Sequence, residues 1–135
     1  MKSNFLVNDV MLKDGLFPKV DQNEMMKETL IEMDKFGLGI ACLVDKANNL
    51  IGVITDGDIR RIILNVNKPM AAIFVDDVQI YSTTNFAKVN PETPLQKAVL
   101  IMEQLKIWDL PVVDKSGNLV GLLHLHPAIK LLLGV

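Results

Sequence analysis

Residues 52–61, with the sequence GVITDGDIRR, combine acidic and basic side chains within a single turn-sized segment. The carboxylates of Asp56 and Asp58 could accept hydrogen bonds from sugar hydroxyls, and a charged acceptor makes such bonds strong. Arg60 and Arg61 could neutralise a phosphate, helped by the positive end of a helix. The segment is therefore typical of a site for a sugar phosphate or a nucleotide.

The same segment also has a purely structural interpretation. Asp56 or Asp58 could cap a helix by accepting a backbone N–H bond, with Gly57 supplying an unusual backbone angle. The two roles are compatible for Asp58. Arg60 and Arg61 could equally form solvated ion pairs or ion pairs between subunits. A catalytic carboxylate pair would need a partner acid–base group, and the sequence pattern supplies none.

A second candidate is the sequence HLH, which places His124 and His126 at alternating positions where a strand is expected to end. Alternation places both imidazoles on one face of the strand. A metal site would need further ligands, and no Cys or acidic pair stands near them in the sequence. Two other interpretations are open: a buried polar pair satisfied by the backbone, or contacts to an anionic sugar or nucleotide that strengthen as the imidazoles protonate.

The composition limits the class of protein. Lys and Arg number 14 against 16 Asp and Glu, and no basic stripe indicates generic nucleic-acid binding. Cys42, the single cysteine, excludes a disulfide framework and favours a reduced, cytoplasmic setting. Its apolar neighbours favour a core position over a reactive thiol. No apolar run approaches the roughly 20 residues of a membrane span, so no membrane partner is expected.

The elements that must position these residues come from an internal repeat. Residues 32–54 align with residues 101–123 without a gap, at the constant offset of 69 that relates Gly52 to Gly121. The identical pairs are Met33/Met102, Val44/Val113, Asp45/Asp114, Lys46/Lys115, Asn49/Asn118, Leu50/Leu119 and Gly52/Gly121. We therefore expect a first repeat at 1–66, a connection at 67–76 and a second repeat at 77–135.

Apolar periodicity and turn residues predict the order β-α-β-β-α in each repeat. The fold class is thus α/β in the broad sense (α+β), with two repeats packed as a pseudo-two-fold pair. The expected elements are extended segments at 17–20 and 86–89, helices within 23–36 and 91–105, hairpin strands at 40–45 with 50–55 and 110–114 with 119–124, and closing helices at 58–65 and 127–133. Pro127 suits the first turn of the last helix.

These motifs resemble a tandem pair of CBS domains, an arrangement called a Bateman module, over essentially the whole chain. The resemblance is carried by EMDKFGLG and IMEQLKIWDLP at the helix ends, by the hairpins and by TDGDIRR. GLGIACLVD, LIGVITDGDIRR and LVGLLHLHPAIKLLLGV more closely resemble the carboxy-terminal CBS pair of arabinose 5-phosphate isomerases of the KpsF/GutQ type. That resemblance implies an upstream sugar-isomerase domain and a chain that is a fragment. A CBS pair beside a sugar nucleotidyltransferase is the alternative parent.

The resemblance also implies where a ligand binds. CBS pairs hold nucleotides in clefts between the two repeats, and the family pattern places Thr55 and Asp58 against the ribose. At the same positions of the second repeat stand His124 and Pro127. Because proline offers no acceptor to a ribose, an ordinary second ribose clamp is in doubt. The isomerase-type relatives resemble this chain in having an LHxH motif here, which favours a ligand or interface role for His124 and His126.

Other residues are implied as pocket lining by the same resemblance. They lie on the strand-entry segments and on the loops that enter the second strand of each repeat, and they are Phe17, Pro18, Val20, Leu38, Gly39, Ala41, Phe86, Ala87, Val89, Trp108, Leu110 and Pro111. Trp108 could stack on a base, but a Trp beside Leu and Pro could also pack or form an interface.

Two functions follow as hypotheses. In the first, the chain is a regulatory module without catalytic residues, bound metal or required cofactor, and its occupancy by AMP, ATP or a CMP-linked acid sugar biases an attached isomerase domain. In the second, it is a ligand-free scaffold that dimerises through its helices, because the terminal sequence IKLLLGV fits a buried helix face. A homo-oligomer, most simply a dimer, is expected in both cases.

Overall fold

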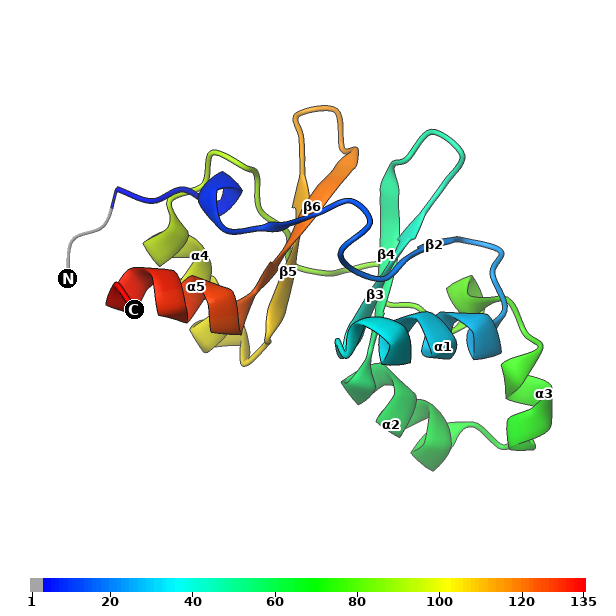
Figure 1. Ribbon diagram of the computed structural model, residues 1–135. Helices are drawn as coiled ribbons and strands as arrows, with labels where there is room; N and C mark the ends of the chain where they lie inside the picture. The colour runs from blue at the N-terminus through cyan, green and yellow to red at the C-terminus, as the bar shows by residue number, and fades with distance from the viewer. Residues whose placement is uncertain (1–3) are drawn as a thin grey trace. The chain divides into compact units, whose positions relative to one another are not determined.

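A computed structural model describes residues 4–135, and the chain divides into two compact units. The first unit comprises residues 15–86, and the second comprises residues 4–14 together with residues 87–135. Over residues 4–135 the chain forms two three-stranded sheets and five α-helices (Figure 1). The predicted α+β class is therefore confirmed.

The first unit is built on a sheet with the strand order β2-β3-β4. Strand β2 runs parallel to β3, while β3 and β4 form an antiparallel hairpin. Its elements in chain order are β2 (Lys19–Asp21), α1 (Met26–Phe36), β3 (Ile40–Val44), β4 (Leu50–Thr55), α2 (Asp56–Asn65), α3 (Met70–Phe74) and the 3-10 turn η2 (Val78–Ile80). The predicted order β-α-β-β-α is present here in full.

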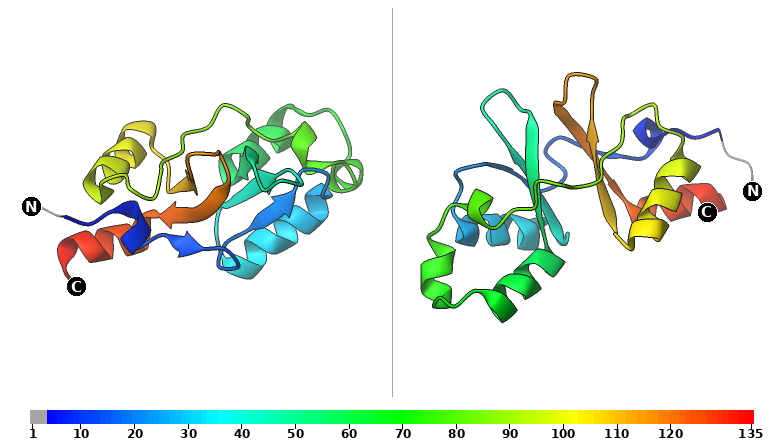
Figure 2. Two further views of the ribbon diagram at one scale, coloured as in Figure 1. Left: turned by 90° about the horizontal axis from the view of Figure 1, so that it is seen from above. Right: turned by 180° about the vertical axis from the view of Figure 1, so that it is seen from behind.

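The second unit repeats the hairpin but replaces the first strand. Its sheet has the order β1-β6-β5, with both neighbours of β6 antiparallel to it. The elements are the 3-10 turn η1 (Val7–Asp9), β1 (Leu12–Lys13), α4 (Leu95–Leu105), β5 (Asp109–Val113), β6 (Leu119–His124) and α5 (Leu125–Leu133). The segment expected to be extended at 86–89 forms no strand, and only Val89 bridges to Val112. Figures 1 and 2 show α4 beside α5.

The hairpin turns confirm the repeat at the level of individual bonds. Asp45 Oδ1 accepts the Asn49 backbone N–H at 2.9 Å, and Asp114 Oδ1 accepts the Asn118 backbone N–H at 3.0 Å. A carboxylate that bonds its own following backbone is the usual way in which Asp stabilises a turn. The same chemistry at the same offset therefore closes both hairpins.

The two 3-10 turns make the compact units differ from the sequence repeats. Val7 N donates to Thr93 O at 2.9 Å in the second unit, and Val78 N donates to Glu24 O at 2.7 Å in the first unit. Both valines are fully buried. The segment that opens each repeat thus packs into the unit formed by the rest of the other repeat.

Several element boundaries depart from the sequence predictions. Helix α2 begins at Asp56 rather than at Asp58, because Thr55 takes the N-cap position. Helix α5 begins at Leu125, with Pro127 in its first turn as expected. The connection predicted at 67–76 contains α3, where Pro69 occupies the N-cap position.

Each unit has its own apolar core. In the first it comprises Val20, Met26, Met33, Ala41, Leu43, Ile54, Ile62, Ile73 and Val78. In the second it comprises Val7, Val89, Leu95, Ala98, Met102, Leu110, Val112, Leu123 and Ala128. Cys42 is buried in β3, in agreement with the core interpretation. Across residues 4–135, no helix has both the length and the apolar character needed to cross a membrane.

Candidate functional site

The start of α2 is a reciprocal capping arrangement between Thr55 and Asp58. Asp58 N donates to Thr55 Oγ1 at 3.2 Å, while Thr55 N donates to Asp58 Oδ2 at 2.9 Å. The Thr55 hydroxyl also donates to Asp58 Oδ2 at 3.1 Å. The spacing Thr-x-x-Asp produces this geometry because the third helical residue can reach back to the N-cap. The capping role proposed for Asp58 from the sequence is therefore present in the structure.

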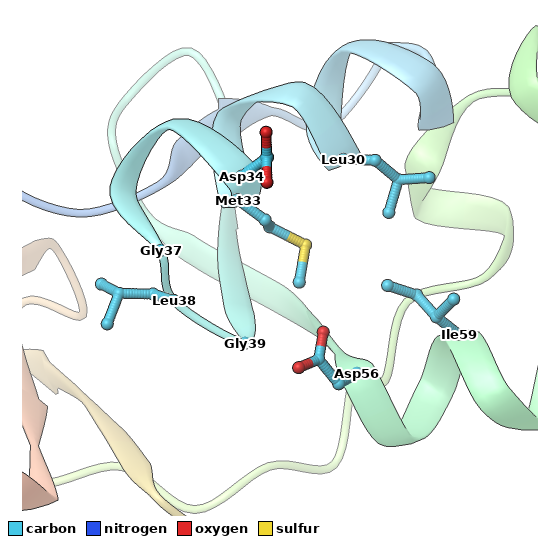
Figure 3. Close-up of a pocket in the computed structure, with 8 residues that line it drawn as sticks. All are labelled: Leu30, Met33, Asp34, Gly37, Leu38, Gly39, Asp56 and Ile59. Carbon is cyan, nitrogen blue, oxygen red and sulfur yellow. The ribbon is translucent and has the colours of Figure 1, made fainter.

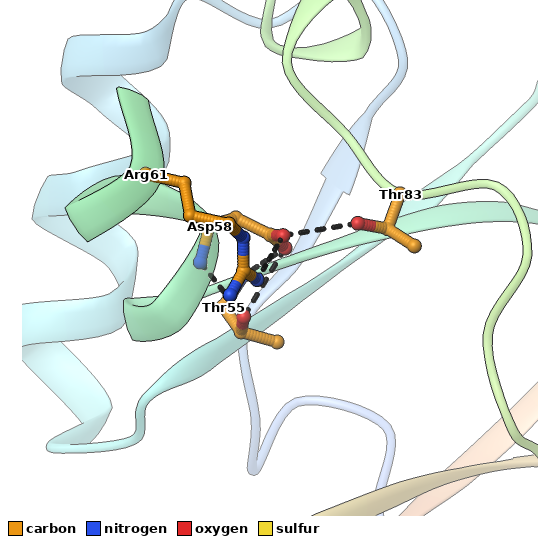
Figure 4. A network of polar contacts seen from close by, with 4 residues as sticks. All are labelled: Thr55, Asp58, Arg61 and Thr83. Carbon is orange, nitrogen blue, oxygen red and sulfur yellow. Dashed lines mark hydrogen bonds and ion pairs between the residues drawn. The ribbon is translucent and has the colours of Figure 1, made fainter. Parts of the chain in front are cut away.

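The other oxygen of Asp58 makes different contacts (Figure 4). Asp58 Oδ1 accepts a bond from Arg61 Nη2 at 2.8 Å and from Thr83 Oγ1 at 3.0 Å. The residue is only 8% exposed, and an ionised carboxylate has about four acceptor positions. The two oxygens therefore make different contacts: Oδ2 accepts the bonds from Thr55 at the helix cap, and Oδ1 accepts the bonds from the Arg61 and Thr83 side chains.

These bonds keep Asp58 ionised. Burial by itself would raise the pKa of Asp58, because a charged group loses hydration. The bonds from Arg61, from Thr55 and from Thr83 outweigh burial and hold the pKa of Asp58 below its ordinary value of 3.8. At neutral pH Asp58 is therefore ionised, and its charge is paired with the Arg61 guanidinium.

The two arginines have different surroundings. The Arg61 side chain is 57% exposed and forms the ion pair with Asp58, which agrees with the ion-pair interpretation. A Cβ built at Gly57 would lie 3.3 Å from Arg61 Nη2, so the guanidinium lies directly over that glycine. Arg60 is exposed on the same helix.

An open hollow of about 310 Å³ lies between the end of α1 and the start of α2 (Figure 3). It is lined by Leu30, Met33, Asp34, Gly37, Leu38, Gly39, Asp56 and Ile59. The hollow brings together Leu38 and Gly39, two predicted ligand residues, with the exposed Asp56 carboxylate. A Cβ at position 39 would lie 2.6 Å from Asp56 Oδ2, so only glycine leaves that carboxylate its present place.

The second unit has a histidine cluster at the equivalent helix start. His124 Nδ1 lies 2.8 Å from Asp109 Oδ1, and the two residues are cross-strand neighbours on β6 and β5. The His124 and His126 rings have centroids 5.0 Å apart, and the His126 ring meets the Trp108 ring edge-on at 5.6 Å. Trp108 is 60% exposed, so its indole is not core packing. The described bond of His124 goes to a carboxylate rather than to the backbone.

Most of the remaining predicted residues are buried. Val20 and Ala41 belong to the core of the first unit, and Val89 and Leu110 to that of the second. Phe17, Pro18 and Pro111 are also buried, whereas Phe86 and Ala87 are half-buried. The polar and charged candidates in each unit gather at the end of one hairpin and the helix that follows it.

Sequence reasoning missed Thr83 and did not connect Asp109 with His124. Thr83 lies outside residues 52–61, the segment that singled out Thr55 and Asp58, so no pattern connected it to them. Asp109 could have been found, because hairpin register pairs it with His124 just as Ile40 pairs with Thr55. Ile40 of the first repeat is replaced by Asp109 in the second, and this change from an apolar residue to an acid was a signal visible in the sequence. Within residues 4–135 no group of three or more His, Cys, Asp or Glu side chains could hold a metal ion.

Comparison with known proteins identifies the class of this fold. The model of the CBS domain family matches residues 7–65 and 75–126, so the chain belongs to the CBS domain family and carries two copies. A CBS pair is a regulatory rather than a catalytic unit. The chain is similar to the arabinose 5-phosphate isomerase KdsD of Pseudomonas aeruginosa, with 33% identity over 124 residues, which cover 92% of this chain and 37% of that enzyme. The chain spans just over a third of the length of the first curated relatives it matches.

Solved CBS pairs share the fold. CBSX2, solved in complex with AMP, superposes with a TM-score of 0.84 at 22% identity, covering 97% of this chain and 98% of that one. The CBS pair of protein MJ0100, solved with 5′-methylthioadenosine and S-adenosyl-L-methionine, gives a TM-score of 0.79 at 22% identity and 96% coverage of both chains. At this identity the likeness establishes the fold.

Proposed function

We propose that the chain is the regulatory, ligand-binding CBS pair of a sugar-phosphate isomerase that interconverts arabinose 5-phosphate and ribulose 5-phosphate. The ligand is a nucleotide or nucleotide sugar, with AMP, ATP and a CMP-linked acid sugar as the candidates. The parent activity is supported by the likeness to KdsD, and the nucleotide by the ligands named for the two solved CBS pairs. The observation that carries the proposal is the ionised Asp58 carboxylate at the start of α2.

Because the two carboxylate oxygens of Asp58 make separate contacts, this one residue can cap the helix and also bind a ligand. Its Oδ2 bonds the backbone and hydroxyl of Thr55, and these bonds are part of the helix. Its Oδ1 bonds Arg61, whose side chain is 57% exposed, and Thr83. A ribose hydroxyl replaces the Arg61 bond at Oδ1 without disturbing the cap, because the Arg61 side chain lies largely in solvent and its guanidinium can exchange the carboxylate for water. The released guanidinium is then free to contact a phosphate.

A second function, dimerisation without a ligand, is supported by apolar side chains on the helices. Ile63 and Leu64 of α2 are 58% and 73% exposed, and Leu133 of α5 is 60% exposed. Large exposed apolar side chains on helices mark surfaces that associate. Dimerisation itself is compatible with the regulatory function, since a dimer can also bind nucleotide.

A thermal-shift panel of AMP, ATP, CMP, CMP-linked sugars and sugar phosphates tests the proposal. A ligand at about 100 times its Kd adds about 2.7 kcal/mol, which raises Tm by roughly 10 °C. Asp58→Asn removes the charge while its amide oxygen can still accept from Thr55 N. This variant should lose most of the ligand-induced rise.

Asp56→Asn is the matched control, because Asp56 lies two positions away on the same turn and is exposed. It should keep the full ligand-induced rise. If no compound in the panel raises Tm while the protein is dimeric, the scaffold function replaces the regulatory one. An equal rise in the parent and in Asp58→Asn would show that the carboxylate is only a cap.

A further inference from the structure

We infer that the histidine cluster of the second unit, formed by His124, His126, Asp109 and Trp108, is a binding site for an oxyanion: the carboxylate of an acid sugar or the phosphate of a sugar or nucleotide. Only the identity of the molecule that carries the anion rests on the proposed function. If the inference holds, the two copies of the repeat bind different chemical groups.

The sequence offset shows the change of charge between the copies. The first copy has Thr55, Asp56 and Asp58 around its second helix start, and the second copy has His124, Leu125 and Pro127 at the same positions. Two carboxylates are thereby removed, while His126 adds an imidazole in place of a glycine. A site that accepted hydrogen bonds has become a site that donates them.

Asp109 orients the first imidazole. Its Oδ1 lies 2.8 Å from His124 Nδ1, so the proton of the neutral ring is placed on Nδ1. This leaves Nε2 as the nitrogen that gains a proton and donates to a ligand. The Asp109 residue is 9% exposed and the His124 side chain 20% exposed, so the pair is largely buried and only the imidazole reaches solvent to any extent.

His126 and Trp108 form the outer part of the cluster. The His126 ring lies 5.0 Å from the His124 ring and 5.6 Å from the Trp108 ring, centroid to centroid. His126 and Trp108 are both exposed, so the cluster opens to solvent at this side. Two imidazoles this close can bond to the same oxyanion. The indole face offers an apolar wall for a sugar or a base.

The charges around the cluster set its pH dependence. Ionisable side chains on the elements that pack against β6 and α5 are Asp109 of β5, Lys97 and Glu103 of α4, Lys106 at the C-cap of α4, Lys13 of β1, and His126 and Lys130 of α5 itself. Of these, Asp109 makes the ion pair described for His124. Two close imidazoles repel when both are charged, and an anion between them removes that repulsion. Anion binding should therefore strengthen as the pH falls through the range in which histidine titrates.

The chain contains only two histidines, so the ring signals in an NMR titration report on this cluster alone. The probe is sulfate, whose charge is constant across this range, and it is added at about pH 6 and about pH 8. Sulfate should shift the ring signals of both histidines and bind several-fold more tightly at the lower pH.

Variants and paired ligands complete the test. His124→Asn retains a donor toward Asp109 but lacks Nε2, and it should weaken sulfate binding about tenfold at the lower pH. Glu28→Gln, at an exposed position of α1 in the other unit, should leave sulfate binding unchanged. Gluconate is compared with glucose, and ribose 5-phosphate with ribose. Shifts with gluconate indicate a carboxylate ligand, shifts with ribose 5-phosphate indicate a phosphate ligand, and either supports the site.

Ring signals that sulfate leaves unmoved, or equal affinity at both pH values, would overturn the inference. If this occurs while AMP or a CMP-linked sugar still raises Tm, the oxyanion site fails and the proposed function stands. If sulfate binds as expected but no nucleotide raises Tm, the oxyanion site stands and the proposed function fails.

Discussion

Thr83 Oγ1 donates to Asp58 Oδ1 at 3.0 Å across a sequence separation of 25 residues. Thr83 lies in the segment expected to open the second repeat, yet it belongs to the compact unit of residues 15–86. Its backbone also bridges to Val53, with Thr83 N donating to Val53 O at 2.8 Å. The candidate site of the first repeat is thus completed by a residue from outside that repeat.

The Thr83 bond should contribute measurably to stability. Thr83→Val keeps the β-branched shape and the backbone bridge but places a methyl group against a buried, charged oxygen. A hydrogen bond to a charged group contributes about 1.5–3 kcal/mol, so the free energy of unfolding should fall by that amount. Urea denaturation measures it. Thr84→Val, at the exposed neighbouring position, should change stability by less than about 0.5 kcal/mol; equal losses in the two variants would contradict this account.

Asp58 should stabilise the folded protein at neutral pH and lose this stabilising effect in acid. Because the pKa of Asp58 is lowered in the folded protein, its contribution to stability is fully present above the ordinary value of 3.8 and disappears as the pH falls through the lowered pKa. The difference in unfolding free energy between the parent and Asp58→Asn should therefore be largest near neutral pH and shrink in acid. The lowered pKa values of Asp45 and Asp76 are common to both proteins and cancel. A constant difference across the pH range would refute the assignment.

A glycine at position 106 should increase the stability of the protein. It adopts φ 56° at the C-cap of α4, where α1 has Gly37 at φ 64°. A left-handed backbone is strained for a residue with a side chain, so Lys106→Gly should raise stability by about 0.5–1 kcal/mol. Gly37→Ala should lower stability by about 1 kcal/mol, since an added Cβ meets no atom within 4 Å and only the backbone cost remains. Thermal unfolding of both variants checks the pair, and a loss of stability in Lys106→Gly would count against it.

Tyr81, the single tyrosine, gives a direct optical readout of the segment beside Thr83. The hydrogen bond that it donates to Asp76 raises the pKa of Tyr81 above its ordinary value of 10.0, and burial adds to the effect. Titration of the phenolate absorbance should show this, and Asp76→Asn should lower the Tyr81 pKa. Asp77→Asn is the neighbouring control. Identical titrations in the parent and in Asp76→Asn would exclude the bond.

Local patterns in the sequence predicted the repeated elements well. The alternation of apolar and turn residues located both hairpins, because a buried strand and an Asx turn are determined by neighbouring residues. The Thr55–Asp58 cap was likewise visible as a spacing. Periodicity did not separate Met25 from Met26: Met26 is buried, whereas Met25 is 39% exposed because it is the N-cap residue of α1.

Long-range relationships were not accessible from the sequence. Val7 and Val78 are each buried in the unit that consists mainly of the other repeat. This packing depends on tertiary contacts that leave no pattern in the local sequence. The same holds for Thr83, whose bond to Asp58 follows from that packing. The β1–β6 pairing replaced the strand expected near Val89, since two residues of strand are too few to show periodicity.

We expect the Oδ1 atom of Asp58 to recognise ribose hydroxyls, and isothermal titration of ribonucleotides against their 2′-deoxy counterparts tests this recognition most directly. AMP and CMP are each compared with the 2′-deoxy form, on the parent, Asp58→Asn and Asp56→Asn. A ribonucleotide should bind the parent and Asp56→Asn at least about tenfold more tightly than its 2′-deoxy form, since a bond to a charged acceptor contributes about 1.5–3 kcal/mol. This preference for the ribonucleotide should vanish in Asp58→Asn. Equal affinities for the two forms in the parent, or a preference that survives in Asp58→Asn, would contradict the account.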